Sequence, residues 1–499
     1  MHRISTIGVA RENSAPENPG ARDPRVAIFP GDVARLVAEG ASVSVEDGAG
    51  AGLNLSNESF AAAGATIESP GSIYRGKDLV IKIKGPGLAA IDQMEPESTL
   101  MCMAHVETFP ERRERANERG VSILALEEIR QFPCRFSDEV VVSGAAVRDA
   151  LKNLPFVASD AEVVVVGFSS RMEGAIRTAA RSNVASVRVV SDPPDARTIM
   201  EATPNTVFFY DSQSGHSDDL LRGIRETGGL VYDIADFERD HAAQAIEEYL
   251  AARNTAEFGK RRVEFLHGTG QDGAWYGIKL LQEQRGASMR LSDQKIVILG
   301  YGNIAIGAID ECIKQGAREL HILGRTRTAS HAIEKELRGA DLIINGADLE
   351  WHERGQVFLI TREHTRNVIK DGAVVIDLVG GSEKERSAIE NIVRCTFLND
   401  PVFVEDGVTF SAIWGWPMVR QFRESAATYS RQITDLLVSA PRLLNGMQVA
   451  DRGVRRAFVA GPAAEVDPSS SDFIGPQPVL GEPLGGLQSS VDETPAIPE

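Results

Sequence analysis

Cysteine is scarce in this sequence. Only four of the 499 residues are cysteines, and they are scattered along the chain (Cys102, Cys134, Cys312 and Cys395). No CxxC pair and no cysteine–histidine spacing of a zinc site occurs among them, so neither a disulfide framework nor a metal site is indicated. Reduced thiols are the usual state in the cytoplasm, and we therefore expect a cytoplasmic protein that binds no metal.

Long apolar runs and an excess of positive charge are also missing. The opening residues, MHRISTIGVARENS, lack the apolar core of a signal peptide, and no later run is long enough to cross a bilayer. A formal net charge of −18 disfavours binding to nucleic acid or to an anionic membrane. We expect small-molecule partners and a homo-oligomer such as a dimer.

Short apolar runs alternate with helical patterns along most of the chain, which predicts largely parallel sheets. The predicted class is α/β, with two Rossmann-like lobes, an extra inserted α/β module and a disordered C-terminal tail. At 499 residues the chain has room for several domains. Residues 460–499 contain seven acids, no lysine or arginine, and many prolines, glycines and serines, which favours disorder. The predicted parts are a substrate domain (1–150, completed by 410–445), the module (155–255), a dinucleotide-binding domain (265–400) and the tail (460–499).

The stretch QKIVILGYGNIAIGA, residues 294–308, has the pattern of a dinucleotide-binding turn. A strand-like run ends in Gly300-x-Gly302-x-x-Ala305, a helical segment follows, and a second strand-like run begins at Leu320. Such a unit places a pyrophosphate at the helix N-terminus, which here begins near Asn303 and Ile304. The alternative is a βαβ turn with a purely structural role.

The end of the second strand lacks the acid that usually binds the ribose of NAD. It reads Gly324-Arg325-Thr326-Arg327 instead. A guanidinium group pairs well with a 2′-phosphate, so NADP is favoured and NAD stays possible. Loop arginines that face only solvent are the competing interpretation.

Three basic or titratable side chains lie at or near the ends of N-terminal elements. Arg25 precedes the run VAIFP, Lys84 closes VIKIK, and His105 closes LMCMA. The carboxyl ends of parallel strands form the ligand-binding edge of an α/β sheet. Arginine and lysine suit a carboxylate, and histidine suits proton transfer. Each residue taken alone could equally have a structural role.

These stretches resemble the family of alanine dehydrogenase, nicotinamide nucleotide transhydrogenase and lysine-forming saccharopine dehydrogenase. The similar segments are RVAIFPGDVARLVAEGASVSVEDGAGAG, DLVIKIKGP, MCMAH, ERGVSILALEEI, KIVILGYGNIAIGAID, GADLIINGADL and GAVVIDLVGG. The resemblance implies that Arg25 and Lys84 hold a substrate carboxylate and that His105, assisted by Lys84, moves a proton. It also implies that Asp377 lies near the nicotinamide, although an aspartate there could instead be a turn or cap residue.

The sequence also departs from this family. It carries the extra block at 155–255, and it has Trp414-Gly415-Trp416-Pro417 where the family has a short Asn/Asp-x-x-Pro element. Trp414 and Trp416 could form a flat apolar wall for a larger substrate.

The resulting prediction is an NAD(P)-dependent oxidoreductase that reduces the imine of a 2-oxo acid and an amine, as in the saccharopine branch, or catalyses the reverse. An alanine dehydrogenase-like amino-acid dehydrogenase is the first alternative. A nucleotide-binding protein without redox turnover, or a cyclodeaminase-like enzyme that recycles its nucleotide, is the second.

Overall fold

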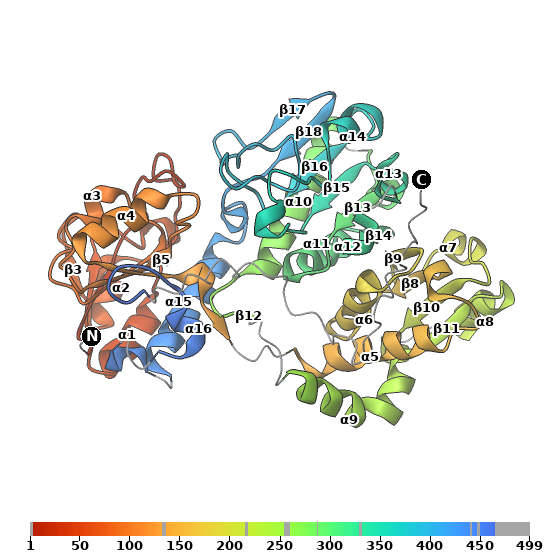
Figure 1. The fold of residues 1–499 in the computed structure, drawn as a ribbon, viewed down its shortest axis with the longest axis horizontal. Helices are drawn as coiled ribbons and strands as arrows, with labels where there is room; N and C mark the ends of the chain where they lie inside the picture. Colours follow the sequence, from red (N-terminus) through yellow and green to blue (C-terminus); the bar gives the residue numbers. More distant parts are fainter. Residues whose placement is uncertain are drawn as a thin grey trace, which may run out of the picture.

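The N-terminal lobe is built on a seven-stranded sheet. Figure 1, drawn from a computed structural model, shows the N-terminal part of this lobe in red and orange and the C-terminal segment that joins it in blue. The structure describes residues 3–131, 136–214, 218–253, 260–286, 288–328, 332–439, 442–446 and 450–464. The strand order is β19-β6-β5-β4-β1-β2-β3, and all neighbours are parallel except β19 and β6. The strands are β1 (Thr6–Val9), β2 (Ser42–Glu46), β3 (Thr66–Glu68), β4 (Leu79–Lys84), β5 (Thr99–Met103), β6 (Ser122–Ala125) and β19 (Phe458–Ala460).

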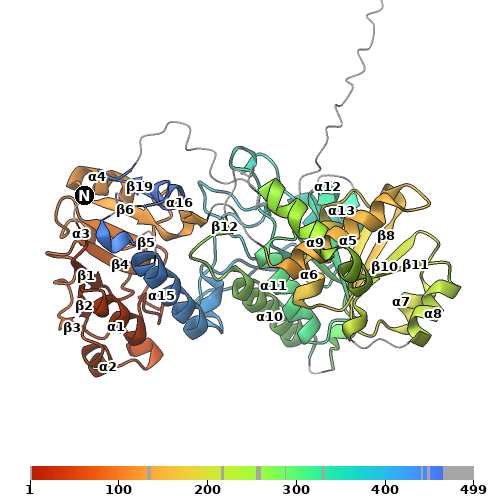
Figure 2. The same cartoon turned by 90° about the horizontal axis from the view of Figure 1, so that it is seen from below.

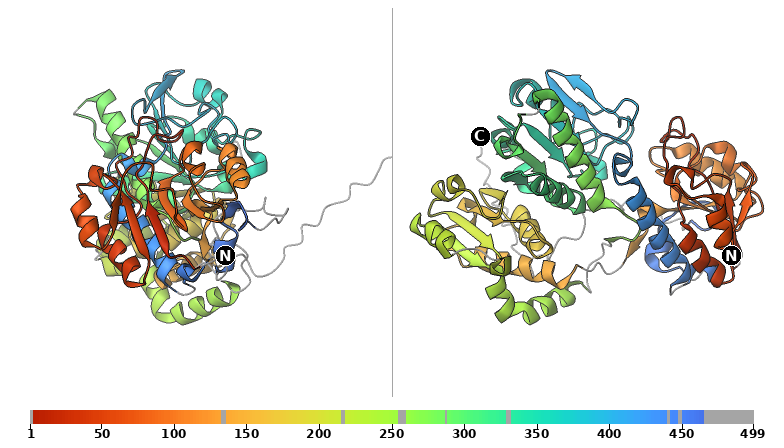
Figure 3. Two further views of the ribbon diagram at one scale, coloured as in Figure 1. Left: turned by 90° about the vertical axis from the view of Figure 1, so that its left-hand side faces the viewer. Right: turned by 180° about the vertical axis from the view of Figure 1, so that it is seen from behind.

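Helices cover both faces of this sheet. One face carries α1 and α15, whose apolar residues share a core with β1 and β4, and the other face carries α3 and α4. Since α15 lies far along the chain, the C-terminal part returns to complete the N-terminal lobe, as the right-hand view of Figure 3 also shows. The helices of this lobe are α1 (Pro30–Ala38), α2 (Asn57–Ala62), α3 (Leu88–Ile91), α4 (Pro110–Arg119), α15 (Phe422–Val438) and α16 (Arg452–Arg455).

A second sheet of ten strands runs through the rest of the molecule in the order β11-β10-β8-β9-β14-β13-β15-β16-β18-β17. Its Rossmann half contains the glycine-rich turn after β13. The strands of this half are β13 (Ile296–Leu299), β14 (Glu319–Leu323), β15 (Leu342–Asn345), β16 (Val374–Asp377), β17 (Phe403–Glu405) and β18 (Val408–Ser411). The helices are α10 (Leu266–Arg285), α11 (Asn303–Lys314), α12 (Arg325–Thr328), α13 (Ala332–Leu337) and α14 (Arg362–Asn367).

The inserted block extends this sheet and does not form a separate one. Its four strands are mutually parallel, and β9 pairs with β14 in the antiparallel sense. The carboxyl ends of the module strands therefore lie at the opposite edge from those of the Rossmann strands. Figure 2 shows the module beside the Rossmann half. Its elements are α5 (Asp138–Lys152), β8 (Glu162–Val166), α6 (Ser170–Arg181), β9 (Ser186–Val190), α7 (Ala196–Met200), β10 (Thr206–Tyr210), α8 (Asp218–Glu226), β11 (Leu230–Asp233) and α9 (Ile234–Arg253).

The predicted α/β class with largely parallel sheets is confirmed. The sequence pattern at 395–398 predicts a further strand, which is wrong because the structure has only isolated bridges there. The next regular strands are β17 and β18, which follow this segment and pair as an antiparallel hairpin. The pattern also predicts that a helix near 423–438 is the last ordered element, which is wrong because α16 and β19 follow it. From residue 465 onward the predicted tail lies outside the described residues. Among the helices that are described, none is both long and apolar enough to cross a membrane.

Glycines allow α10 and α11 to pack in direct backbone contact, which positions the glycine-rich turn. A Cβ atom at Gly307 would lie 1.9 Å from the His267 carbonyl oxygen, and one at Gly270 would lie 1.9 Å from the Ile304 carbonyl oxygen. Any larger residue must push the two helices apart.

We predict that Gly307→Ala lowers the free energy of unfolding by about 1–3 kcal/mol through overpacking. Thermal unfolding followed by circular dichroism measures this change. Gly223→Ala is the matched control, because its nearest neighbouring atom would be 3.7 Å away and alanine favours the α8 helix. Equal melting temperatures for the two variants would contradict the close packing.

Candidate active site between the two lobes

A cleft of about 960 Å³ lies between the lobes and brings together most of the residues expected to carry chemistry. Arg25, Lys84, His105, Trp414 and Trp416 all line it. From the Rossmann half, the residues after β15 and β16 line the opposite wall, namely Asp348 and residues 378–381. The cleft therefore joins the carboxyl edges of both sheets.

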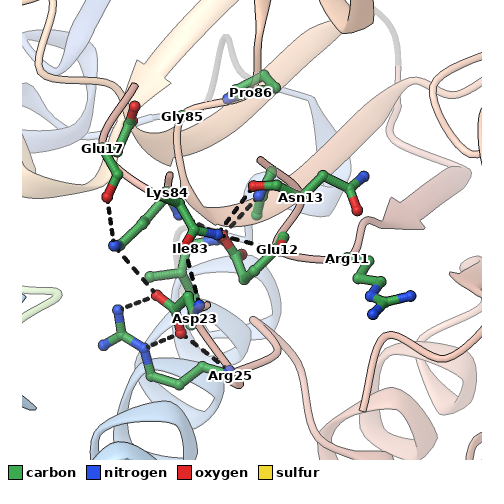
Figure 4. A network of polar contacts seen from close by, with 12 residues as sticks. Arg11, Glu12, Asn13, Glu17, Asp23, Arg25, Ile83, Lys84, Gly85 and Pro86 are labelled. Carbon is green, nitrogen blue, oxygen red and sulfur yellow. Dashed lines mark hydrogen bonds and ion pairs between the residues drawn. The ribbon is translucent and has the colours of Figure 1, made fainter. Parts of the chain in front are cut away.

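Arg25 and Lys84 are buried cations that share one carboxylate (Figure 4). Arg25 donates from Nε and Nη2 to the two oxygens of Asp23, at 2.9 and 2.7 Å. The Lys84 ammonium lies 3.8 Å from Asp23 Oδ2 and donates to the Glu17 carbonyl oxygen at 2.8 Å. Asp23 thus neutralises part of the charge that burial would otherwise penalise.

This environment shifts the ionisation of both partners. Burial lowers the pKa of Lys84 to about 8 and the charge of Arg25 acts in the same direction, against the opposing effect of Asp23. Burial alone would raise the pKa of Asp23, but Arg25 and Lys84 lower that pKa to about 2. At neutral pH Lys84 is therefore mostly a cation, and it loses its proton as the pH rises through about 8.

Two further buried acids, which the sequence analysis did not identify, hold this side of the cleft. Glu12 accepts hydrogen bonds from the backbone amides of Ile83 and Lys84 and from the Lys82 ammonium, at 2.7–3.2 Å. The other acid is Glu17, whose carboxylate pairs with the buried Arg112. These contacts hold the end of β4, where Lys84 lies.

His105 occupies the left-handed backbone region, with φ of 43°, directly after β5. Its amide donates to Glu127 Oε1 at 2.7 Å, and its Nδ1 lies 3.9 Å from the same oxygen. The imidazole is one-third exposed and packs edge-on against Trp414, with ring centroids 5.1 Å apart. A non-glycine residue held in this conformation is typical of functional sites.

The two tryptophans differ in their roles. Trp414 is partly exposed and contacts the rings of His105 and Phe109, so it forms the apolar wall expected from the sequence. Trp416 is 3% exposed, and its Nε1 donates to the Asp377 carbonyl oxygen at 3.0 Å. Trp416 therefore anchors the 414–417 segment to the end of β16 and exposes little surface to a ligand.

The expectation that Asp377 lies near the nicotinamide is not supported by its contacts. Its side chain is fully buried and accepts hydrogen bonds from Asn345 Nδ2, the Val379 amide and the Ser387 hydroxyl. These bonds tie the ends of β15 and β16 together. The acids that do line this wall of the cleft are Asp348 and Glu385.

The glycine-rich turn has the geometry that a dinucleotide pyrophosphate needs. Gly300 has φ of 98° and lies so close to the end of β15 that a Cβ would be 3.0 Å from the Ala347 amide nitrogen. Gly302 is the residue before α11, no side chain caps this helix, and a Cβ at Gly302 would meet nothing within 4 Å. The α11 N-terminus, beginning with Asn303, Ile304 and the buried Ala305, is therefore accessible to an anion.

The helix α6 of the inserted block packs directly beside this turn. The Arg177 guanidinium donates to the Tyr301 carbonyl oxygen and to Asn303 Oδ1, both at 2.7 Å. A Cβ at Gly324 would lie 1.8 Å from the Ala180 carbonyl oxygen, so glycine is required where α6 meets the end of β14. Arg177 was not identified from the sequence, because nothing near it indicates contact with a turn far along the chain.

The two arginines expected near the ribose 2′ position also differ. Arg327 is buried and donates to the Ile322 carbonyl oxygen at 2.8 Å, with longer contacts to Ala180 and Val184 in the inserted block. It is therefore committed to joining the block to β14, which corrects the expectation of a phosphate ligand. Arg325 is 64% exposed, and its nearest acids, Glu350 and Glu353, are 3.4 and 3.8 Å away. The Thr326 side chain lies outside what the structure describes.

The comparisons with known proteins agree with this geometry. Residues 8–135 match the family described as "Alanine dehydrogenase/PNT, N-terminal domain". The match is confined to this N-terminal segment of the chain. In the structure it contains Arg25, Lys84 and His105.

Curated relatives match the same end of the chain. The alanine dehydrogenase of Bacillus subtilis is 31% identical over 125 residues, which is 25% of this chain and 32% of the relative. The NAD(P) transhydrogenase subunit alpha of Cereibacter sphaeroides is 27% identical over 169 residues, 33% of this chain and 30% of the relative. The matches thus span about a third of each relative.

The fold likeness extends much further than the sequence likeness. A solved L-alanine dehydrogenase structure aligns over 94% of this chain and 98% of its own, with a TM-score of 0.56 and 15% identity. The overall fold is therefore similar to that of this L-alanine dehydrogenase structure.

We predict that substrate affinity falls as the pH rises through about 8, because Lys84 then loses the charge that attracts a carboxylate. In Asp23→Asn the anion that favours protonated Lys84 is gone, so the inflection should move to lower pH. The pH profile of KM for the carboxylate substrate measures both effects. An inflection at the same pH in Asp23→Asn would show that Lys84 does not control it.

Proposed function

We propose that this chain is an NAD(P)-dependent oxidoreductase that acts on the C–N bond of an amino acid or of the corresponding imine. The observation that carries the proposal is the shared cleft. It joins Arg25, Lys84 and His105 to the carboxyl edge of the sheet that bears the glycine-rich turn. Ligands of α/β sheets bind at such edges, next to the point where the strand order reverses, here between β13 and β15.

The residues of the chain suit this chemistry in separate roles. The backbone amides at the start of α11 would hold the pyrophosphate of NAD(P), and the nicotinamide supplies hydride transfer when it is bound. The guanidinium of Arg25 and the ammonium of Lys84 would hold the substrate carboxylate. The partly exposed imidazole of His105 would exchange the proton that accompanies a change between amine and imine.

Two substrate types fit this arrangement. The names of the relatives support an amino-acid dehydrogenase of the alanine dehydrogenase type better than the saccharopine-like reaction favoured from the sequence. A cleft of about 960 Å³ is large for a three-carbon amino acid, which supports an imine formed with a second amine as the finer alternative.

Turnover of nucleotide tests the proposal. Purified protein is mixed with NADH or NADPH, a 2-oxo acid and an amine, and absorbance at the nicotinamide band is followed. Stoichiometric consumption of nucleotide supports the proposal. Binding without consumption would instead identify a sensor or a protein that recycles its nucleotide.

We predict that His105→Ala lowers kcat by roughly 10²- to 10⁴-fold, because the proton-transfer group is lost. Nucleotide affinity, measured by fluorescence titration, should stay within about twofold of the unchanged protein. His267→Ala is the matched control, because this exposed histidine pairs with Asp310 on α11 and does not line the cleft. A His105→Ala protein with full turnover would assign His105 a structural role.

We also propose that Arg325 selects NADPH over NADH by pairing with the 2′-phosphate. Arg325→Asp should reverse this preference, because a carboxylate accepts hydrogen bonds from the ribose hydroxyls and repels the phosphate. The ratio of Kd values for the two nucleotides measures the effect. Arg338→Asp is the control, because it makes the same charge change on another turn of this half. An equal change in the Kd ratio for both variants would show that Arg325 does not select the nucleotide.

A further inference from the structure

The wall of the cleft beyond His105 is lined by arginines from two separate segments. Arg261 comes from β12 (Lys260–Arg261), and Arg452, Arg455 and Arg456 come from α16 and the residue that follows it. They gather in a chain whose net charge is −18, so the local excess of positive charge is not a general property of the surface. A cleft lined by one sign of charge concentrates ligands of the other sign.

Backbone pairing holds these segments in place. β12 pairs antiparallel with β7 (Arg130–Gln131), and the Arg262 amide donates to the Ile129 carbonyl oxygen at 2.9 Å. The Ala125 amide donates to the Ala457 carbonyl oxygen at 2.8 Å, which anchors the start of β19 to the end of β6. The arginines therefore lie on segments that backbone hydrogen bonds fix to the N-terminal lobe.

Most other charges in the cleft are already paired. Asp23 binds Arg25, Glu107 binds Arg113, and Asp348 binds Arg354 at 2.7 Å. Glu128 binds Arg130 at 3.1 Å, and both oxygens of the Glu127 carboxylate accept backbone amides.

Arg261 and Arg455 differ from these pairs. Among the described residues no carboxylate lies within 4.0 Å of either guanidinium group. Arg455 donates from Nε to the Ala450 carbonyl oxygen at 2.7 Å, which orients its guanidinium group. Arg261 is close enough to affect the ionisation of Glu128 and Tyr429 in one lobe and of Asp348 in the other. It thus lies between the walls of the cleft.

We infer that the cleft binds a substrate with a second anionic group, a carboxylate or a phosphate, which Arg261 and Arg455 hold on the far side of His105 from Lys84. This inference rests on the proposed function and specifies its substrate class. The planar guanidinium group pairs with either anion through two parallel hydrogen bonds.

The order of the strands sets the length of such a substrate. Lys84, His105 and Glu127 follow β4, β5 and β6, and Arg456 precedes the next strand, β19, at the same edge. Since neighbouring strands lie about 4.8 Å apart, the two anion positions differ by on the order of 10–15 Å at the backbone. The reach of the side chains shortens this gap, but several atoms must still separate the two anionic groups. Alanine carries a single carboxylate and does not meet this requirement.

The test compares substrates that differ only in the second charge. The first pair is 2-oxoglutarate and 2-oxoglutaramate, in which an uncharged amide replaces the second carboxylate, each with ammonium. The second pair is an amino acid and its amide, each as the amine with pyruvate. A third comparison sets 3-phosphonooxypyruvate against 3-hydroxypyruvate. The member whose second group is charged is called the anionic member, and the other is called the neutral member. We expect kcat/KM to favour the anionic member in at least one comparison, and the comparison that responds identifies the anion and its carrier.

In the variant Arg261→Gln/Arg455→Gln, kcat/KM for the anionic member should fall roughly 10- to 100-fold, as for loss of charged hydrogen bonds. The value for the neutral member should change less than about twofold. Arg442→Gln is the matched control, because this exposed arginine pairs with Glu39 away from the cleft. No preference for an anionic member, or an equal loss for both members, would overturn the inference.

Calorimetry separates this inference from the proposed function, since it needs no turnover. Glutarate or inorganic phosphate should bind the unchanged protein more tightly than butyrate, and the double variant should lose this advantage. If glutarate or phosphate binds in this way but no substrate is turned over, the subsite stands and the redox proposal fails. If pyruvate and ammonium are turned over but glutarate, phosphate and butyrate bind equally well, the subsite is overturned and the redox proposal stands.

Discussion

The cation pair at the end of β4 depends on one buried carboxylate. Arg25 and Lys84 are almost fully removed from solvent, and the Asp23 side chain between them is fully buried. Two buried cations without an anion would repel each other and would favour loss of the lysine proton. Asp23 already accepts three hydrogen bonds from Arg25, donated by its backbone amide, Nε and Nη2. The remaining donors of Arg25 and Lys84 are therefore the ones that can meet a ligand carboxylate. The cleft, its proposed substrate and its pH dependence all follow from this arrangement.

The rest of the fold brings a second set of groups to the same cleft. Glycine contacts hold α10 against α11 and so position the glycine-rich turn, and the end of β16 forms the facing wall. Arg177 from the inserted block binds the turn from its other side. The turn is thus held by two parts of the chain that are far apart in sequence, which limits its freedom to move.

Much of this was predictable from local pattern. The largely apolar runs at 162–166, 186–190, 206–210 and 342–345 predict strands, because such runs between polar turns are typical of buried parallel strands. The strands β8, β9, β10 and β15 have these bounds. Lys84 and His105 were predictable as a pair, since they lie at the ends of the neighbouring strands β4 and β5. Arg25 lies in the loop before α1 and was singled out by the family resemblance of the run that follows it. The contacts of Asp377 were not predictable, because a strand-end aspartate has the same local pattern whether it faces a ligand or its neighbouring strands. The partners Asn345 and Ser387, which show that it faces its neighbours, are distant in sequence.

Long-range pairing explains the other differences. Arg327 and Arg325 are two residues apart and equally basic, yet only the contact of α6 with β14 distinguishes the buried one from the exposed one. Arg261 and Arg455 carry no motif, and they reach the cleft because β12 pairs with β7 and β19 pairs with β6. Such pairings add a residue to a site without leaving a periodicity or a spacing in the sequence.

The antiparallel junction between β9 and β14 gives the ten-stranded sheet two opposite polarities. One half presents its carboxyl ends toward the inter-lobe cleft, and the other half presents its carboxyl ends away from it. Loops after the module strands can therefore differ in length and charge without entering the inter-lobe cleft. The C-terminal turn of α6 has no such freedom, because it packs against Gly324 at the end of β14. A single continuous sheet thus places the loops of one half at the cleft and gives the loops of the other half a separate face.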